Sequence, residues 1–261
     1  MNITSKKVQW IDIQNLIDQY FCELGYKNDG FHSNIIFEGD PYIIEHNDVT
    51  IGFFSLGNSW DNGKMFRTFY IISKYRNLSK NVFQLLMEEF DIEAVLVTSN
   101  DFHLISLSFE KMNALKTGFD MQAFNFVYGE PSREAEFGRN TVSRVTDFVQ
   151  MNSLTEQQWD GMFDDHNNQF YVIKAGEEIL GYGGICSMGY NKKNVDIGNY
   201  VLPEHRRKGV GRSILINLGK IALEQGFIPV AGCWYGNTES IATLTSAGYI
   251  PENRIFYVRF K

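Results

Sequence analysis

The sequence has few of the residues that mark secreted, zinc-binding or membrane-spanning proteins. Its three cysteines, Cys22, Cys186 and Cys233, are widely spaced and form no Cys-x-x-Cys pair. An odd, scattered set of this kind predicts neither a disulfide framework nor a zinc site, so we expect a reducing compartment. No run approaches the roughly 20 apolar residues that span a bilayer, and the N-terminus has no secretion-signal core. We therefore expect a soluble, cytoplasmic chain that does not act at membranes.

Basic residues are also too few for a nucleic-acid-binding surface. The 24 Lys and Arg side chains face 31 Asp and Glu, a net charge of -7. Because phosphate backbones are held chiefly by accumulated Lys and Arg, this balance disfavours nucleic acid as a partner. Hydrophobic residues make up 44% of the chain and charged residues 21%, which is enough apolar content for a buried core.

One short acidic segment raises the question of a metal site. His166 stands beside Asp164 and Asp165 in the segment FDDHNNQF. No further ligand follows at a helical or hairpin spacing, so the segment is predicted to be a polar loop and no metal is expected.

Two stretches of the chain resemble each other in order and spacing. Residues 41–76 align with residues 170–206 at a nearly constant shift. The following pairs stand 129 or 130 positions apart: Tyr42 and Tyr171, Gly52 and Gly181, Arg76 and Arg206. The segment between the halves, GEPSREAEFGRN at 129–140, has the polar composition of a linker. The pattern predicts a duplication, with domains at 1–130 and 131–261.

Each half reads as strands followed by helix, strand, helix and strand. In the second half the β-rich runs FYVIKA, ILGYGGICSM and VDIGNYVL are separated by turn residues, which favours antiparallel hairpins. From Ile214 to Ala222 apolar residues then recur at steps of three and four, as on one side of a helix. IPVAGCW and RIFYVRF are expected strands with a short helix, 241–247, between them. The predicted fold is α/β, with a mixed, mostly antiparallel sheet and flanking helices.

The stretch VLPEHRRKGVGRSIL, 201–215, combines features of an anion-binding loop. Pro203 cannot donate in a strand ladder, so the strand is expected to end there. Gly209 and Gly211 permit close approach to the main chain, and the N-terminus of the next helix leaves amides unpaired beside a partial positive charge. Neither GxxxxGK[ST] nor GxGxxG with its later acidic residue is present. A solvated turn is the alternative interpretation.

The motif R-x-x-G-x-G at 206–211, together with the later segment GNTESIATLTSAGY, resembles the GNAT acyl-CoA N-acyltransferase superfamily. The resemblance covers roughly 141–261 and implies two tandem GNAT-like domains with a degenerate first copy. It implies acetyl-CoA as the acyl donor, its diphosphate held by the amides of residues 207–213 and its pantetheine arm beside the strand near residue 201. The residues implied in coenzyme binding are Val201, Arg206, Arg207, Lys208, Gly209, Val210, Gly211, Arg212, Ser213, Asn237 and Ser240.

The same resemblance implies how catalysis would proceed. An amine attacks the thioester directly, so the site needs a proton acceptor, an oxyanion donor and an acid for the thiolate. Asp196 matches the family's acidic position and is the candidate proton acceptor, with a polar hairpin position as the alternative. The amide near Val201 is the implied oxyanion donor. Leu244 stands where members often carry the tyrosine acid, and neither Tyr235 nor Tyr249 can be placed, so the acid stays unassigned.

The first half departs from the motif where the second half carries it. YRNLSKNV at 75–82 has no glycine, so this copy is predicted not to hold coenzyme A.

The favoured function is an N-acyltransferase that acetylates a primary amine of a small molecule. A non-catalytic acyl-CoA sensor or structural partner is the alternative, and a tRNA-linked transferase is disfavoured by the net charge. The acceptor and the oligomeric state stay open.

Overall fold

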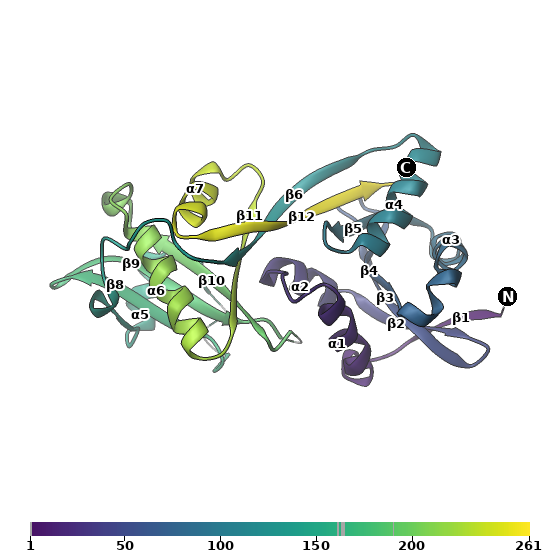
Figure 1. The fold of residues 1–261 in the computed structure, drawn as a ribbon, viewed down its shortest axis with the longest axis horizontal. Helices are drawn as coiled ribbons and strands as arrows, with labels where there is room; N and C mark the ends of the chain where they lie inside the picture. The colour runs from purple at the N-terminus through teal and green to yellow at the C-terminus, as the bar shows by residue number, and fades with distance from the viewer. Residues whose placement is uncertain (1, 161, 163–164, 190) are drawn as a thin grey trace. The chain divides into compact units, whose positions relative to one another are not determined.

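The computed structural model describes residues 2–160, 162, 165–189 and 191–261. The chain forms two compact units (Figure 1). The N-terminal unit comprises residues 1–26, 31–124 and 253–261, and the C-terminal unit comprises residues 27–30 and 125–252. The predicted division lay at residue 130. In the structure, residues 27–30 and 125–130 lie in the C-terminal unit, and residues 253–261 lie in the N-terminal unit.

The N-terminal unit contains six neighbouring strands of the sheet, with helices packed on them. Its strand order is β1-β2-β3-β4-β5-β12. Neighbouring strands pair antiparallel, except for β4 and β5, which are parallel. The strands are β1 (Ile3–Lys7), β2 (Asp40–His46), β3 (Val49–Asn58), β4 (Lys64–Ile71), β5 (Ile92–Thr98) and β12 (Tyr249–Arg259). The helices are α1 (Gln14–Glu23), α2 (Gly30–Phe37), α3 (Ser79–Glu89) and α4 (Phe102–Leu115), with 3₁₀ segments at Trp10–Ile13 and Ser73–Leu78.

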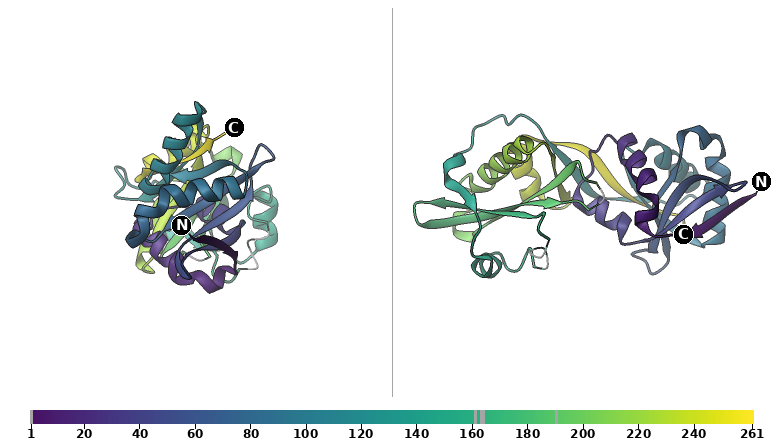
Figure 2. Two further views of the ribbon diagram at one scale, coloured as in Figure 1. Left: turned by 90° about the vertical axis from the view of Figure 1, so that its right-hand side faces the viewer. Right: turned by 90° about the horizontal axis from the view of Figure 1, so that it is seen from below.

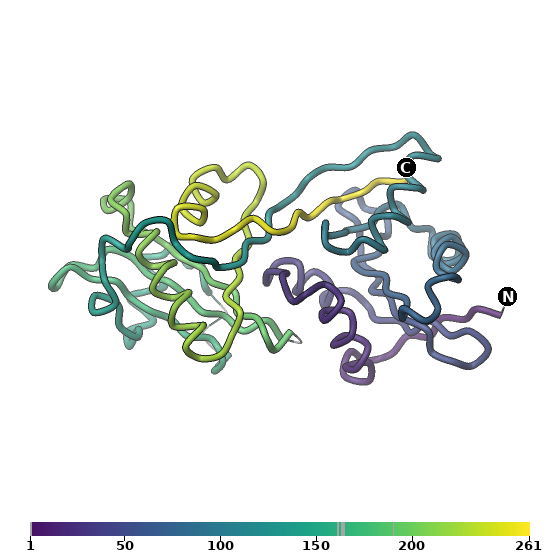
Figure 3. Tube along the Cα trace, viewed as in Figure 1, coloured from purple at the N-terminus to yellow at the C-terminus, as the bar shows by residue number. Residues whose placement is uncertain are grey.

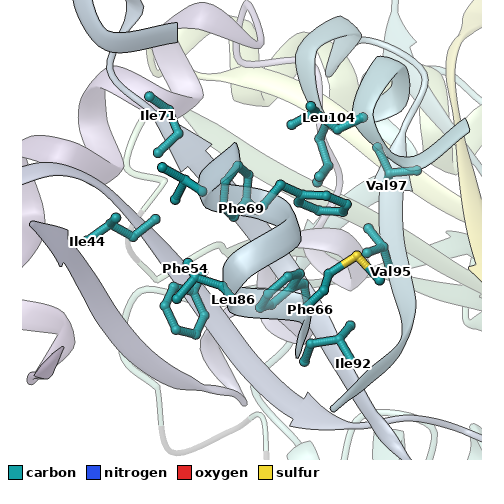
Figure 4. Close-up of a cluster of buried hydrophobic side chains, with 14 of the residues drawn as sticks. Ile44, Phe54, Phe66, Phe69, Ile71, Leu86, Ile92, Val95, Val97 and Leu104 are labelled. Atoms are coloured by element: carbon teal, nitrogen blue, oxygen red, sulfur yellow. The ribbon is translucent and has the colours of Figure 1, made fainter. Parts of the chain in front are cut away.

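One apolar cluster holds this unit together. Phe54 and Phe66 from the sheet are buried with Leu86 of α3 and Leu104 of α4 (Figure 4). Phe54 and Phe66 meet edge to face, with ring centroids 5.3 Å apart. Burying an aromatic side chain of this size contributes about 1.5–3 kcal/mol. The N-terminal unit therefore has a well-packed core of its own, although it lacks the glycine loop.

The C-terminal unit repeats the same plan. Its strand order is β6-β11-β10-β9-β8-β7, and the parallel pair β10 and β11 takes the place of β4 and β5. The strands are β6 (Phe119–Tyr128), β7 (Val142–Arg144), β8 (Gln169–Ala175), β9 (Glu178–Ser187), β10 (Asn194–Val201) and β11 (Ile228–Trp234). The helices are α5 (Phe148–Leu154), α6 (Val210–Glu224) and α7 (Thr238–Ser246), with 3₁₀ segments at Arg139–Thr141 and Pro203–His205.

Alternation along β9 explains how α5 and α6 cover opposite faces of this sheet (Figure 2). Tyr182 points into the apolar cluster formed with Met151 of α5. Gly183 faces the other way, and a Cβ there would lie 2.6 Å from side-chain atoms of Ile214 and Leu218 on α6. Glycine at 183 thus lets α6 pack close to the sheet, which fixes where its N-terminus lies.

The final strand of each half pairs outside its own half. β12, the last strand of the second half, pairs antiparallel with β5, from Ile255 opposite Thr98 to Arg259 opposite Ala94. β6, the last strand of the first half, lies next to β11. The path of both strands can be followed in Figure 3. The predicted mixed α/β fold with two tandem domains is confirmed, but the exchange of final strands was not predicted.

Candidate active site

The site begins where β10 and β11 stop pairing. Their parallel ladder contains Asn194 with Ile228, Val195 with Pro229 and Asp196 with Val230. Beyond that last pair, residues 197–201 of β10 and 231–234 of β11 line a cleft of about 850 Å³. The separation of two neighbouring strands therefore opens the sheet within the C-terminal unit.

The separation also leaves main-chain groups of β10 facing the cleft. The amide of Leu202 donates to the carbonyl of Leu180, at 3.1 Å, in register with the antiparallel pairing of β9 and β10. Since amides alternate in direction along an antiparallel ladder, those of Asn199 and Val201 point to the opposite edge. That edge is the one that β11 has left.

The loop after β10 and the first turn of α7 close the cleft. Most of the residues that the sequence predicted for coenzyme binding line it. These are Val201, Arg206, Arg207, Gly209, Val210, Gly211, Arg212, Asn237 and Ser240. Lys208 is exposed and Ser213 is buried, and neither lines the cleft. The predicted set is thus brought together within one cleft, with two members at its margin.

Backbone conformation explains why the loop needs its glycines. Gly209 is the N-cap of α6 and has φ +79°, in the left-handed region that L-residues avoid. A Cβ at Gly211 would lie 3.0 Å from Thr243 and 3.2 Å from Asn199, so α6 starts in close contact with α7 and β10. No side chain caps α6. Its first amides therefore remain available to an anion.

An acidic side chain from the linker contacts this loop. The carboxylate of Glu136 pairs with the guanidinium of Arg212, with Nε at 3.2 Å from Oε2, and accepts from the Ser213 hydroxyl at 3.4 Å. A Cβ at Gly209 would lie 2.4 Å from the Glu136 carboxyl carbon. The backbone next to Glu136 is anchored on the same helix, because the Phe137 amide donates to Ser213 Oγ at 3.1 Å. The sequence offered no signal for this contact, since Glu136 is one of several polar linker residues.

Asp196 lies at the closed end of the cleft but does not line it. Its Oδ2 accepts a hydrogen bond from the Gly30 amide at 3.1 Å. Desolvation raises the pKa of Asp196 to about 6, against the lowering effect of hydrogen bonds from the amides of Gly30 and Ile197. A carboxylate in this environment changes its protonation state close to neutral pH.

The position at which a tyrosine would be expected to act as general acid is occupied by Leu244. Leu244 is buried in α7 and lines the cleft. Tyr249 is buried and its hydroxyl donates to the Leu215 carbonyl, so it is directed elsewhere. Tyr200 does line the cleft, and its hydroxyl donates to Glu156 at 2.8 Å. The hydrogen bond to Glu156 raises the pKa of Tyr200. Sequence reasoning missed Tyr200, which directly precedes Val201 in the quoted strand.

In the N-terminal unit, the segment after β4 corresponds to the glycine loop after β10, and it contains an ion pair. Arg76, which aligns with Arg206, pairs with the carboxylate of Glu23. Glu23 also accepts from the hydroxyls of Tyr70 and Ser73, each at 2.9 Å. A 3₁₀ segment, Ser73–Leu78, leads directly into α3 without glycine. The positive charge of Arg76, after β4, is thus paired with a carboxylate of the protein itself.

Two further features concern metals and membranes. Within the described residues, no group of three or more His, Cys, Asp or Glu side chains is arranged to hold a metal ion. Asp165 accepts from the Asn167 amide and the Ser187 hydroxyl, as in a polar loop, and Asp164 lies outside the described residues. No helix in the described part of the chain has the length and apolarity needed to cross a membrane.

Comparison with known proteins agrees with this architecture. Residues 9–127 match the sequence model "Acetyltransferase (GNAT) domain", and residues 138–249 match "Acetyltransferase (GNAT) family". A search of curated proteins found no significant match. Among solved structures, a GNAT-family acetyltransferase from Colwellia psychrerythraea is similar over 100% of both chains, with a TM-score of 0.76 and 15% identity.

Two other solved structures share the fold over nearly the whole chain. A tandem GNAT protein from the clavulanic acid biosynthesis pathway covers 98% of both chains, with a TM-score of 0.57 and 12% identity. A GCN5-related N-acetyltransferase from Sphaerobacter thermophilus matches 98% of this chain and 96% of its own, with a TM-score of 0.54 and 10% identity. At these identities the structural likeness shows the fold, while the sequence models show the family. The chain belongs to the GNAT superfamily of acetyltransferases and contains two GNAT domains in tandem.

Proposed function

We propose that the C-terminal unit transfers the acetyl group of acetyl-CoA to a primary amine of a small molecule. The observation that carries the proposal is the cleft between β10 and β11, which joins a free strand edge to the uncapped N-terminus of α6. A strand edge suits the amide groups of a pantetheine arm, and a helix N-terminus suits a diphosphate. Family membership supports acetyl transfer as the reaction.

The contact of Glu136 with the loop tests whether an anion fits there. An internal carboxylate already pairs with Arg212 and Ser213 beside Gly209. These groups are therefore arranged to hold negatively charged oxygens, as the coenzyme's diphosphate would require. The same contact implies competition, because a bound diphosphate and the Glu136 carboxylate repel each other at close range.

The residues that would hold the coenzyme follow from the walls of the cleft. Amides from 207 to 212 would bind the diphosphate, with Arg206, Arg207 and Lys208 adding positive charge. The amide of Ser213, also expected from the sequence, donates to the Gly209 carbonyl at 3.0 Å instead. The amides of Asn199 and Val201 would face the pantetheine arm and the thioester, with Val201 the candidate oxyanion donor. Asn237 caps α7 by accepting from the Ser240 amide at 3.1 Å, so these two residues position the opposite wall. When bound, acetyl-CoA supplies the electrophilic carbonyl carbon.

Asp196 is the proposed proton acceptor for the amine. Its carboxylate lies behind the cleft wall rather than in it, so the proton would reach it through an intervening water. A pKa of about 6 makes Asp196 mostly ionised at pH 7 and still basic enough to accept a proton.

A non-catalytic acyl-CoA sensor is the second candidate, and Leu244 favours it. The side chain that replaces the usual tyrosine is apolar, so it cannot return a proton to the thiolate. A sensor would bind acetyl-CoA without releasing free thiol in the presence of any amine. An acetyltransferase would release thiol with at least one member of an amine panel.

The first prediction concerns the loop glycines. Gly209→Glu and Gly211→Glu each add a carboxylate to the proposed diphosphate site, and coenzyme A affinity should fall at least about tenfold. Isothermal titration calorimetry measures the change. Gly118→Glu is the matched control, because nothing lies within 4 Å of a Cβ there. Absence of coenzyme A binding by the unmodified chain, or undiminished binding by both loop variants, would contradict the proposal.

The second prediction concerns the competing carboxylate. Glu136→Gln removes a charge next to the loop and should tighten coenzyme A binding about two- to fivefold, since partly exposed charge interactions contribute up to about 1 kcal/mol. The gain should shrink as salt is raised, because the interaction is screened. Glu134→Gln, in the same linker and exposed, is the control and should leave affinity unchanged. Equal affinities for wild type and Glu136→Gln would show that the two anions do not compete.

The third prediction concerns pH. Because Asp196 accepts a proton only when ionised, thiol release should rise as pH passes through about 6 and then level off. Asp196→Asn should remove this limb and lower kcat about 10²- to 10⁴-fold. The effect of pH on folding stability runs in the opposite direction to its effect on activity. A raised pKa in the folded state means that wild type loses stability relative to Asp196→Asn as pH rises from about 4 to about 6.

Urea titrations of both proteins at several pH values would measure that stability difference. A difference that is independent of pH would show that the Asp196 carboxyl titrates alike in the folded and unfolded chain. An unchanged kcat in Asp196→Asn would remove this residue from the reaction.

A further inference from the structure

A short segment of the first half of the sequence is built into the C-terminal unit. Residues 27–30, between α1 and α2, belong to this unit. The carbonyl of Asn28 accepts from Asn194 Nδ2 at 3.1 Å, and the amide of Gly30 donates to Asp196 at 3.1 Å. Both partners stand on the part of β10 that is still paired with β11. The segment is therefore attached at the closed end of the cleft.

Two glycines make this attachment possible. A Cβ at Gly30 would lie 2.4 Å from Oδ2 of Asp196, which is far inside a normal contact. A Cβ at Gly232 of β11 would lie 1.9 Å from Oδ2 of Asp29. Each glycine thus admits one carboxylate against the main chain of another segment. Gly232 also lines the cleft, so the segment is packed directly behind the cleft wall.

Asp29 is held by a defined partner. It is fully buried, and the Asn125 side-chain amide, with its nitrogen turned toward Asp29, donates to both carboxylate oxygens at 2.9 and 3.0 Å. Asn125 is itself buried and stands on β6, in the portion that belongs to the C-terminal unit. A doubly hydrogen-bonded, buried carboxylate fixes the position of the residue that follows it.

The Gly30 amide thereby has a fixed direction toward Asp196. A main-chain donor in a rigid segment holds the acceptor oxygen in one orientation and favours the ionised form. Other titratable groups near this carboxyl are Cys186 of β9, whose pKa burial raises to about 12, and the buried Tyr249. Asp29 is the acidic residue of the segment itself. The two amides that donate to Asp196 are those of Ile197, on β10 itself, and Gly30, on the segment.

We infer that Gly30 is a positioning residue for Asp196 and that Asp29 anchors it, so that the degenerate first half supplies part of the second half's acyl-transfer site. The inference rests on the proposed role of Asp196. It gives the N-terminal copy a function other than coenzyme binding: its loop after α1 orients the proton acceptor of its partner copy. Neither Asp29 nor Gly30 lines the cleft, so both would act through Asp196.

Gly30→Ala tests the inference, because the new methyl group would displace the carboxylate. We expect the pKa of Asp196, measured by NMR titration of its carboxyl carbon in the full-length chain, to rise by about 0.5–1 unit as the amide hydrogen bond is lost. The kcat for thiol release should fall about tenfold or more, while the calorimetric affinity for coenzyme A stays the same. Gly118→Ala, where the methyl group meets open space, is the matched control.

Asp29→Asn provides a second variant of nearly the same shape in case Gly30→Ala does not fold. Loss of one of the two hydrogen bonds from Asn125 should loosen the segment and shift the pKa of Asp196 in the same direction. A pKa of Asp196 that is unchanged in both folded variants would overturn the inference. The NMR titration needs no turnover, so an inactive wild-type chain would count against the proposed function alone and leave the titration to decide on Gly30.

Discussion

The parting of β10 and β11 after Asp196 and Val230 is the constraint on which the proposed chemistry depends. When a strand is paired on both sides, its amides donate to the neighbouring strands and cannot bind a ligand. Once β11 diverges, the amides of Asn199 and Val201 face an open cleft, and α6 starts at the mouth of that cleft. Gly183 and Gly211 maintain the arrangement, because they let α6 approach the sheet and α7 closely. Strand edge and helix N-terminus are thereby brought to one place.

Both units place a carboxylate against the cationic segment that follows the fourth strand of the copy. In the N-terminal unit Glu23 binds Arg76, Tyr70 and Ser73, and no glycine loop is present. In the C-terminal unit Glu136 binds Arg212 and Ser213, yet α6 begins beside it at a glycine, without a side-chain cap. The side chain of Glu136 is 39% exposed, which leaves it room to move away when another anion arrives. We therefore interpret the first copy as closed to a diphosphate and the second as open to one.

Local features of the sequence were sufficient to predict the loop, the helix that follows it and part of the cleft lining. The positive φ at Gly209 and the apolar spacing along α6 depend on neighbours within a few residues, so they leave a local signature. The exchange of final strands could not be predicted, because β5 and β12 are far apart in the chain. The alternation of apolar and polar residues along β5 would suit pairing with either β6 or β12. The contacts of Glu136 and Gly30 were missed for the same reason: each joins residues more than 70 positions apart. Asp196 was chosen as a candidate because it matches the acidic position of the family, whereas its contact with Gly30 depends on that distant segment.

The central claim is that main-chain amides between residues 207 and 212 bind the diphosphate of coenzyme A. Amide NMR spectra of the full-length chain, recorded during titration with coenzyme A, test it most directly. The account predicts the largest shifts at the amides of Gly209 and Gly211, with smaller changes at Asn199 and Val201, and little change at Arg76 and Ser79 of the N-terminal unit. Saturable binding that leaves the amides of 207–212 unshifted, or that shifts the N-terminal unit instead, would contradict it.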